Sequence, residues 1–162
     1  MKFSINQQDL QKSLSYCQGV IEKRSTLPIL SNVLLDASNG KLKITATDLD
    51  IIFIQQISNI EILEEGKTTT SSSIMYDIVR KFSSGKKINF SNPGENKLQL
   101  ESEKSLFNLN CINASEFPLT DENFNENEFI IKSKELLKLL NKCKFSVSND
   151  ETRHYLSGIF FH

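Results

Sequence analysis

The sequence has little of what most catalytic sites are built from. It holds two histidines, three cysteines and no tryptophan in 162 residues. The cysteines are isolated, none forms a CxxC pair, and their odd number argues against a disulfide framework. No P-loop, GxGxxG, HExxH or GxSxG pattern occurs, so neither an enzyme nor a bound cofactor is expected.

Long apolar runs are also missing. No segment approaches the roughly 20 apolar residues of a membrane span, and the N-terminus lacks the features of a signal peptide. Cys17, Cys111 and Cys143 each fall in phase with an apolar pattern, which predicts buried free thiols. We therefore expect a soluble, cytoplasmic protein without a membrane partner.

Charge is low overall but unevenly distributed. The net charge is −1, which gives no global attraction to nucleic acid. Residues 1–127 hold 13 basic and 16 acidic side chains, whereas 128–162 hold 6 and 4. Any binding of a polyanion is therefore expected to be local.

One pattern is repeated: a strand, a helix, then a run of strands. The first copy covers residues 1–62 and the second 67–111, and a third begins at Glu128. Helices on one face of antiparallel sheets are the expected packing, which makes the fold class α+β. The predicted organisation is one domain over 1–115, an acidic linker over 116–127, and the start of a second domain over 128–162.

The first copy has clear local signals. Asn6 is placed to cap a helix whose buried face holds Leu10, Leu14, Cys17 and Ile21. Asn39-Gly40 predicts a two-residue hairpin turn, because a type I′ turn needs positive φ at both positions. A long β-prone run, Ile51 to Ile62, follows.

The second copy predicts a helix capped by Ser72 or Ser73, with Ile74, Ile78 and Phe82 at steps of four. Short strands are expected at 87–91, 97–101 and 105–111. Residues 115–128 hold five acidic and no basic side chains, together with Pro118, which predicts a linker. A new strand is expected at Phe129 to Ile131, and another at the end, Ile159 to His162.

The third predicted helix, capped by Ser133 and running to about Phe145, is the most informative chemically. Lys134, Lys138 and Lys142 step by four and line one face, nearly opposite an apolar face of Leu136, Leu139, Leu140 and Cys143. Such a cationic face can contact phosphates without reading sequence. A solvated lysine face is the alternative. Arg24, beside Lys23, can likewise bind phosphate, or the two cations can simply stabilise the C-terminal end of the helix dipole.

Two catalytic interpretations are weaker. Asp48 and Asp50 lie two apart and could share a metal, as in a metal-dependent nuclease, but nothing nearby supplies further ligands. A Cys–His nucleophile would need an exposed, acidic thiol, against the apolar phasing of all three cysteines.

Several motifs together resemble the bacterial sliding clamp family, the β subunit of DNA polymerase III. They are Met1-Lys2-Phe3, Thr26-Leu27-Pro28-Ile29-Leu30, Thr47-Asp48-Leu49-Asp50, Glu116-Phe117-Pro118 and Arg153-His154-Tyr155-Leu156-Ser157-Gly158. The similarity runs along the whole chain but covers less than half of a complete family member. It is similar to the first domain, the linker and the opening of the second domain, so a truncated chain is expected.

The resemblance implies a DNA clamp fold and a non-catalytic processivity factor for DNA replication. Family members form head-to-tail homodimeric rings around double-stranded DNA, with helices lining the pore. They tether the replicative polymerase subunits, and a clamp loader is a further partner. On this basis the expected DNA contacts are Arg24, Asn149, Asp150, His154 and Tyr155, beside the three lysines.

Two further sets follow from the resemblance. Arg153 and Leu156 match the edge of the pocket that takes partner peptides. Ile74, Ile78, Phe107 and Leu109 resemble the apolar patch of the dimer interface, although ordinary core is the alternative for these four. A binding module that uses only this patch, without encircling DNA, remains a separate hypothesis.

Overall fold

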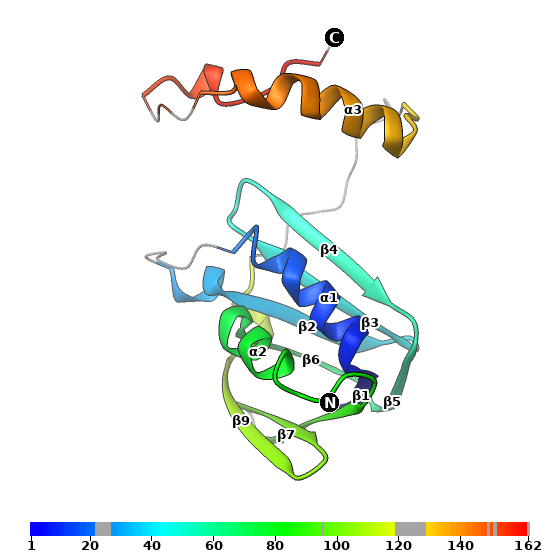
Figure 1. The fold of residues 1–162 in the computed structure, drawn as a ribbon. Coiled ribbons are helices and arrows are strands. Elements are labelled where there is room, and N and C mark those ends of the chain that lie inside the picture. The colour runs from blue at the N-terminus through cyan, green and yellow to red at the C-terminus, as the bar shows by residue number, and fades with distance from the viewer. Residues whose placement is uncertain (22–26, 95, 119–128, 149, 151, 162) are drawn as a thin grey trace. The chain divides into compact units, whose positions relative to one another are not determined.

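The computed structural model describes residues 1–21, 27–94, 96–118, 129–148, 150 and 152–161. The chain divides into two compact units, Met1–Thr120 and Asp121–His162, which we call unit 1 and unit 2. Figure 1 shows their elements. Each unit is described separately.

Unit 1 holds nine strands and two α-helices within its described residues. The strands are β1 (Lys2–Asn6), β2 (Asn32–Ser38), β3 (Lys41–Thr47), β4 (Ile52–Ile57), β5 (Ile60–Glu64), β6 (Gly66–Ser71), β7 (Lys87–Gly94), β8 (Lys97–Ser102) and β9 (Ser105–Ile112). The helices are α1 (Gln7–Cys17) and α2 (Ser72–Val79), with short 3₁₀ turns η1 (Pro28–Ser31) and η2 (Ala114–Glu116).

The strands form one antiparallel sheet in which the two repeats exchange their first strands. The order is β4-β3-β2-β6-β9-β8-β7-β1-β5. Thus β1 of the first repeat pairs with β7 of the second, and β6 of the second pairs with β2 of the first. The last strand, β5, pairs with β1 and follows β4 directly in the chain, so the repeats are interlocked.

Helices α1 and α2 lie side by side over one face of this sheet (Figure 1), as the repeated pattern predicts. Two glutamines join them at opposite ends. Gln7 Nε2 donates to the Val79 carbonyl at 2.9 Å, and Gln18 Nε2 donates to Ser72 Oγ at 2.9 Å. The start of α1 therefore lies by the end of α2, and the helices are antiparallel.

The core lies between these helices and the inner face of the sheet. Leu10, Leu14 and Cys17 of α1 are fully buried, as the sequence predicts, and Ile21 is 7% exposed. Phe3 and Phe90 stack with ring centroids 4.6 Å apart and an angle of 5° between planes. Because these rings lie on β1 and β7, the exchanged strand is held by side chains as well as by backbone pairing.

The local signals of the first repeat are confirmed at its cap and hairpin. Asn6 Oδ1 accepts from the Gln8 amide at 2.9 Å. Asn39 and Gly40 have φ of 51° and 70°, as a type I′ turn requires. The β-prone run from Ile51, however, makes two strands with different partners: β4 pairs with β3, whereas β5 pairs with β1.

The predicted cap and buried face of α2 need correction. Ser71, not Ser72 or Ser73, is the cap, and its side chain accepts from the Ile74 amide. The buried residues are Ser72, Met75 and Val79, while Ile74 is 54% exposed. Ile74 and Ile78 therefore lie along the border between the buried and the exposed face of the helix, not at the centre of the buried face, and Phe82 lies beyond the end of the helix.

Three further buried apolar residues lie outside the main core. Leu30, Leu34 and Phe117 are buried, yet none belongs to the principal core cluster. Leu30 lies in η1, which contacts β2, and Phe117 directly follows η2, which contacts β6. Phe117 is 4% exposed, so the start of the predicted linker is anchored on unit 1; residues 119–127 of that linker lie outside the described set.

Unit 2 contains one α-helix, α3 (Ser133–Cys143), with 3₁₀ turns η3 (Lys144–Ser146) and η4 (His154–Leu156) in its described part. The strands predicted at 129–131 and at 159–162 are wrong for residues 129–131 and 159–161, because no described segment pairs with them. Lys132, not Ser133, is the cap, and its side chain makes no capping hydrogen bond. No helix among the described residues is long and apolar enough to cross a membrane.

The three cysteines divide between the units. Cys17 and Cys111 are buried, as predicted, but Cys143 is exposed. The prediction for Cys143 is wrong because α3 buries none of its residues among the described parts of the chain. Burial raises the pKa of the Cys17 thiol to about 12 and also raises that of Cys111.

We expect a thiol reagent at pH 8 to modify Cys143 rapidly and the other two only after unfolding. The nucleophile is the thiolate, which burial of Cys17 and Cys111 disfavours. Mass spectrometry of peptides from a timed labelling reaction measures this. In the control, Cys143→Ser should abolish the fast phase; fast labelling that persists in this variant would contradict the burial of the other thiols.

Candidate nucleic-acid interface

Helix α3 presents the predicted cationic face. Lys134, Lys138 and Lys142 are all exposed and, at steps of four, share one side of the helix. Lys142 lies in the last turn and Glu135 in the first, which suits the helix dipole. The opposite side is only partly covered, since Leu136 and Leu140 are half-buried. The face is thus open to a polyanion.

The segment after α3 folds into a tight turn. The Ser148 amide donates to the Leu156 carbonyl at 2.9 Å, and the Leu156 amide donates to the Arg153 carbonyl at 2.9 Å. Tyr155 is 81% exposed. This turn brings together four predicted site residues, Asp150, Arg153, Tyr155 and Leu156. A fifth, His154, begins η4, which also holds Tyr155 and Leu156.

Two of the predicted DNA contacts fall outside the part of the chain that the structure describes. They are Arg24 and Asn149. Their roles therefore stay predictions that rest on the family resemblance alone.

Unit 1 offers a polar helical surface that the sequence patterns did not single out. A shallow groove between α1 and α2 is lined by polar residues that include Gln11, Lys12 and Arg80. The Arg80 guanidinium pairs with Asp77 at 3.0 Å and lies 5.9 Å from the centroid of the Tyr76 ring. Lys12 lies on the side of α1 opposite Leu10 and Leu14. Its position on the polar side of this amphipathic helix is a sequence signal that could have identified it as a surface cation.

The predicted apolar patch is only partly at the surface. Ile74 is 54% and Phe107 39% exposed, and Ile78 is partly buried against the core. The Phe107 ring meets Phe82 edge-on at 5.8 Å. Leu109 is 7% exposed and belongs to the core. Phe107, two residues earlier, lies on the same face of β9, and this face is buried at Cys111 and Leu109 but exposed at Phe107.

Strand β9 also carries a free edge. It pairs with β6 only at Cys111 and Ile112, whereas it pairs with β8 from Ser105 to Asn110. The backbone of residues 105–110 therefore has no strand partner on the β6 side within the described chain. Such an edge is a template for another strand.

Asp48 and Asp50 shape a turn. Asp48 Oδ1 accepts from the amides of Asp50, at 3.0 Å, and Ile51, at 2.7 Å. Leu49 between them has φ of 83°, and Thr47 Oγ1 accepts from its amide at 3.0 Å. Among the described residues, no group of three or more His, Cys, Asp or Glu side chains could hold a metal ion, so the nuclease hypothesis lacks a ligand set in that part of the chain.

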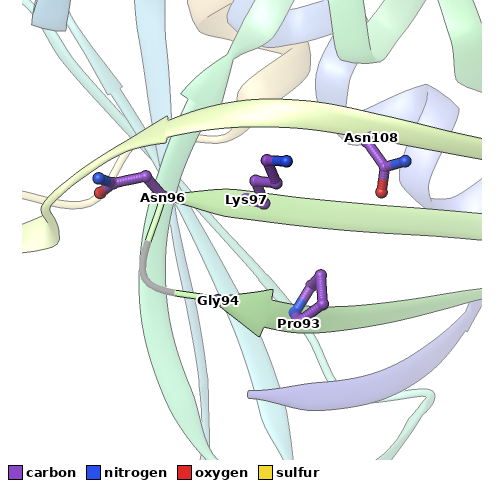
Figure 2. Close-up of a pocket in the computed structure, with 5 residues that line it drawn as sticks. All are labelled: Pro93, Gly94, Asn96, Lys97 and Asn108. Carbon is purple, nitrogen blue, oxygen red and sulfur yellow. The ribbon is translucent and has the colours of Figure 1, made fainter.

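A surface hollow of about 490 Å³ lies where β7, β8 and β9 run side by side. Figure 2 shows its lining: Pro93, Gly94, Asn96, Lys97 and Asn108. One cation and two amides supply hydrogen bonds but no acid–base pair. Its described lining therefore holds no constellation for catalysis.

Comparison with known proteins gives a consistent result. The family model of the DNA polymerase III beta subunit, N-terminal domain, matches residues 1–121. The beta sliding clamp of Caulobacter vibrioides (strain NA1000 / CB15N) is 35% identical over 164 residues, which cover 100% of this chain and 44% of the relative. That of Escherichia coli (strain K12) is 33% identical over 161 residues, 99% of this chain and 44% of the relative.

Solved structures agree in fold. The sliding clamp (DNA polymerase III subunit beta) of Bartonella birtlesii bound to griselimycin has a TM-score of 0.95 and 36% identity, over 100% of this chain and 43% of that one. The C. crescentus beta sliding clamp with bound PEG has a TM-score of 0.92 and 35% identity, over the same shares. This chain spans 44% of the length of these curated relatives. It belongs to the DNA polymerase III beta subunit family, and the N-terminal domain of that family lies over residues 1–121.

Proposed function

We propose that this chain forms part of a ring that encircles duplex DNA and tethers a replicative polymerase to it. The observation that carries the proposal is the whole-chain match to sliding clamps, at a TM-score of 0.95 for one solved structure. The ring acts by enclosure rather than by catalysis. Such a protein needs only weak, sequence-independent contacts with DNA, which fits a net charge of −1 with local cationic faces.

The proposed organisation keeps a first domain over 1–115, a linker over 116–127 and the start of a second domain from 128. The antiparallel helices α1 and α2 would face the DNA in unit 1, with Lys12 and Arg80 on their exposed side. In unit 2 the contacts would come from the lysine face of α3 and from the turn that carries Tyr155. Arg24 and Asn149 complete the set.

Partner contacts are assigned to two other surfaces. Arg153 and Leu156 would form the edge of a pocket for peptides of polymerase subunits and of the clamp loader. The patch around Ile74 and Phe107, with the free edge of β9, would join a second subunit head to tail. Both elements of the second surface support this role, since an exposed apolar patch and an unpaired strand edge favour association. We place the assembly in the cytoplasm.

Replacing Lys134, Lys138 and Lys142 by glutamine should weaken duplex binding by the chain and make it less sensitive to salt. Each lysine that contacts a phosphate contributes about 0.9 to the magnitude of the slope of log K against log salt concentration. The slope of the triple variant should therefore be smaller in magnitude by about 2.7. Fluorescence anisotropy with a labelled duplex across a salt series measures the slope.

The matched control replaces three lysines of unit 1, Lys41 in β3, Lys97 in β8 and Lys104 in the turn between β8 and β9, and removes the same charge. Its slope should stay near that of the unchanged chain. Equal reductions in the two triple variants would mean that net charge, not the α3 face, determines binding.

Enclosure itself is testable in a chimaera in which this chain replaces the matching 44% of the Escherichia coli relative. After loading, the chimaera should remain on nicked circular DNA and be lost when that DNA is linearised, because a ring slides off an open end. Gel filtration of the loaded DNA before and after cutting gives the retained fraction. A folded chimaera retained equally on both forms would refute enclosure.

A further inference from the structure

The turn in unit 2 is organised by the carboxylate of Asp150. Its Oδ1 accepts from the Thr152 amide at 3.0 Å and from Thr152 Oγ1 at 2.6 Å. Its Oδ2 accepts from Arg153 Nε at 2.9 Å. The Asp150 amide donates to Ser148 Oγ at 3.0 Å. Both carboxylate oxygens therefore have partners within the same turn.

These contacts favour the ionised form of the carboxylate. The Thr152 side-chain hydrogen bond, then the Thr152 amide and the Arg153 guanidinium, lower the pKa of Asp150. Asp150 is therefore negatively charged at neutral pH, directly against the guanidinium. The Asp150 and Arg153 side chains are 36% and 60% exposed, so an anionic ligand in solvent can compete for this arginine.

The electrostatic consequence concerns the surface proposed to meet DNA. A phosphate that approaches Arg153 meets a cation already paired and a carboxylate that repels it. The pair as a whole has no net charge, so it releases no counterion on binding. We propose that Asp150 is a positioning residue that holds Arg153 away from DNA phosphates and so weakens the grip of this turn on duplex DNA.

This inference rests on the proposed contact between the turn and DNA, and it assigns to Asp150 the role of weakening that contact. The competing explanation is that Asp150 only builds the turn. Asp150→Asn separates the two, because the amide keeps an oxygen for the Thr152 donors but loses the charge that binds Arg153.

The experiment measures salt-dependent binding of a labelled duplex by the full chain, by Asp150→Asn, by Arg153→Gln and by the double variant. Asp150→Asn should steepen the slope of log K against log salt by about 0.9, because Arg153 then neutralises one more phosphate. Arg153→Gln should not steepen the slope in the original chain, and it should remove that increase in the Asp150→Asn background. A structural role alone would not produce this coupling.

Two controls sharpen the result. Glu61→Gln breaks the Glu61–Lys87 pair on the sheet, 3.2 Å in length, and removes the same charge; its slope should not change. Asp150→Glu should behave as the original chain. The Arg153 Nε–H proton, followed by NMR without DNA, should exchange faster with water in Asp150→Asn.

The outcomes are distinguishable. If Asp150→Asn binds with an unchanged slope, or if Arg153→Gln has the same effect in both backgrounds, the inference is wrong and the proposed DNA contact stands. If neither the original chain nor Asp150→Asn binds duplex at low salt, the proposed DNA contact is wrong, and the proposed role of Asp150 is wrong as well.

Discussion

The exchange of first strands between the two repeats is the constraint on which unit 1 depends. β1 adds to the strands of the second repeat, and β6 adds to those of the first. Neither repeat alone can complete its sheet or cover its helix, so the buried apolar face has to be assembled from both. The stacked pair Phe3 and Phe90 joins the exchanged β1 to its host strand. Two glutamine side chains bind α1 to α2 in the same way, across the boundary of the repeats.

This interlocking also determines the surfaces of the unit. Because both helices cover the same face, their polar sides form one exposed surface with Lys12 and Arg80. The pairing of β9 with β6 is confined to Cys111 and Ile112, so the rest of β9 has an unpaired edge beside the exposed ring of Phe107. The proposed roles follow this division: helices toward DNA, and the strand edge toward another subunit. Unit 2 adds helix α3 with its three exposed lysines, and a turn in which Asp150 forms an ion pair with Arg153.

The sequence predicts the local elements of unit 1 well where the signal is chemical and short-range. The Asn6 cap, the Asn39-Gly40 turn and the buried face of α1 all follow from residues close in the chain. Pairing partners could not be predicted, because alternation in β1 or β6 does not say which repeat supplies the neighbour. The same limit explains Cys143: an apolar helix face predicts burial only if something covers it, and α3 has no buried residue among those described. The Asp150–Arg153 pair, in contrast, is short-range, but its geometry depends on a turn that the pattern predicts only as a loop.

Native-state hydrogen exchange tests the interlocking most directly. We expect the amides of β1 and β6 to open with the same free energy as amides of β2 and β8, because losing either exchanged strand exposes the core of both repeats. Residues such as Phe3 and Thr70 would then exchange only through unfolding of all of unit 1. Exchange of β1 amides at a much lower free energy, with β2 and β8 still protected, would contradict it.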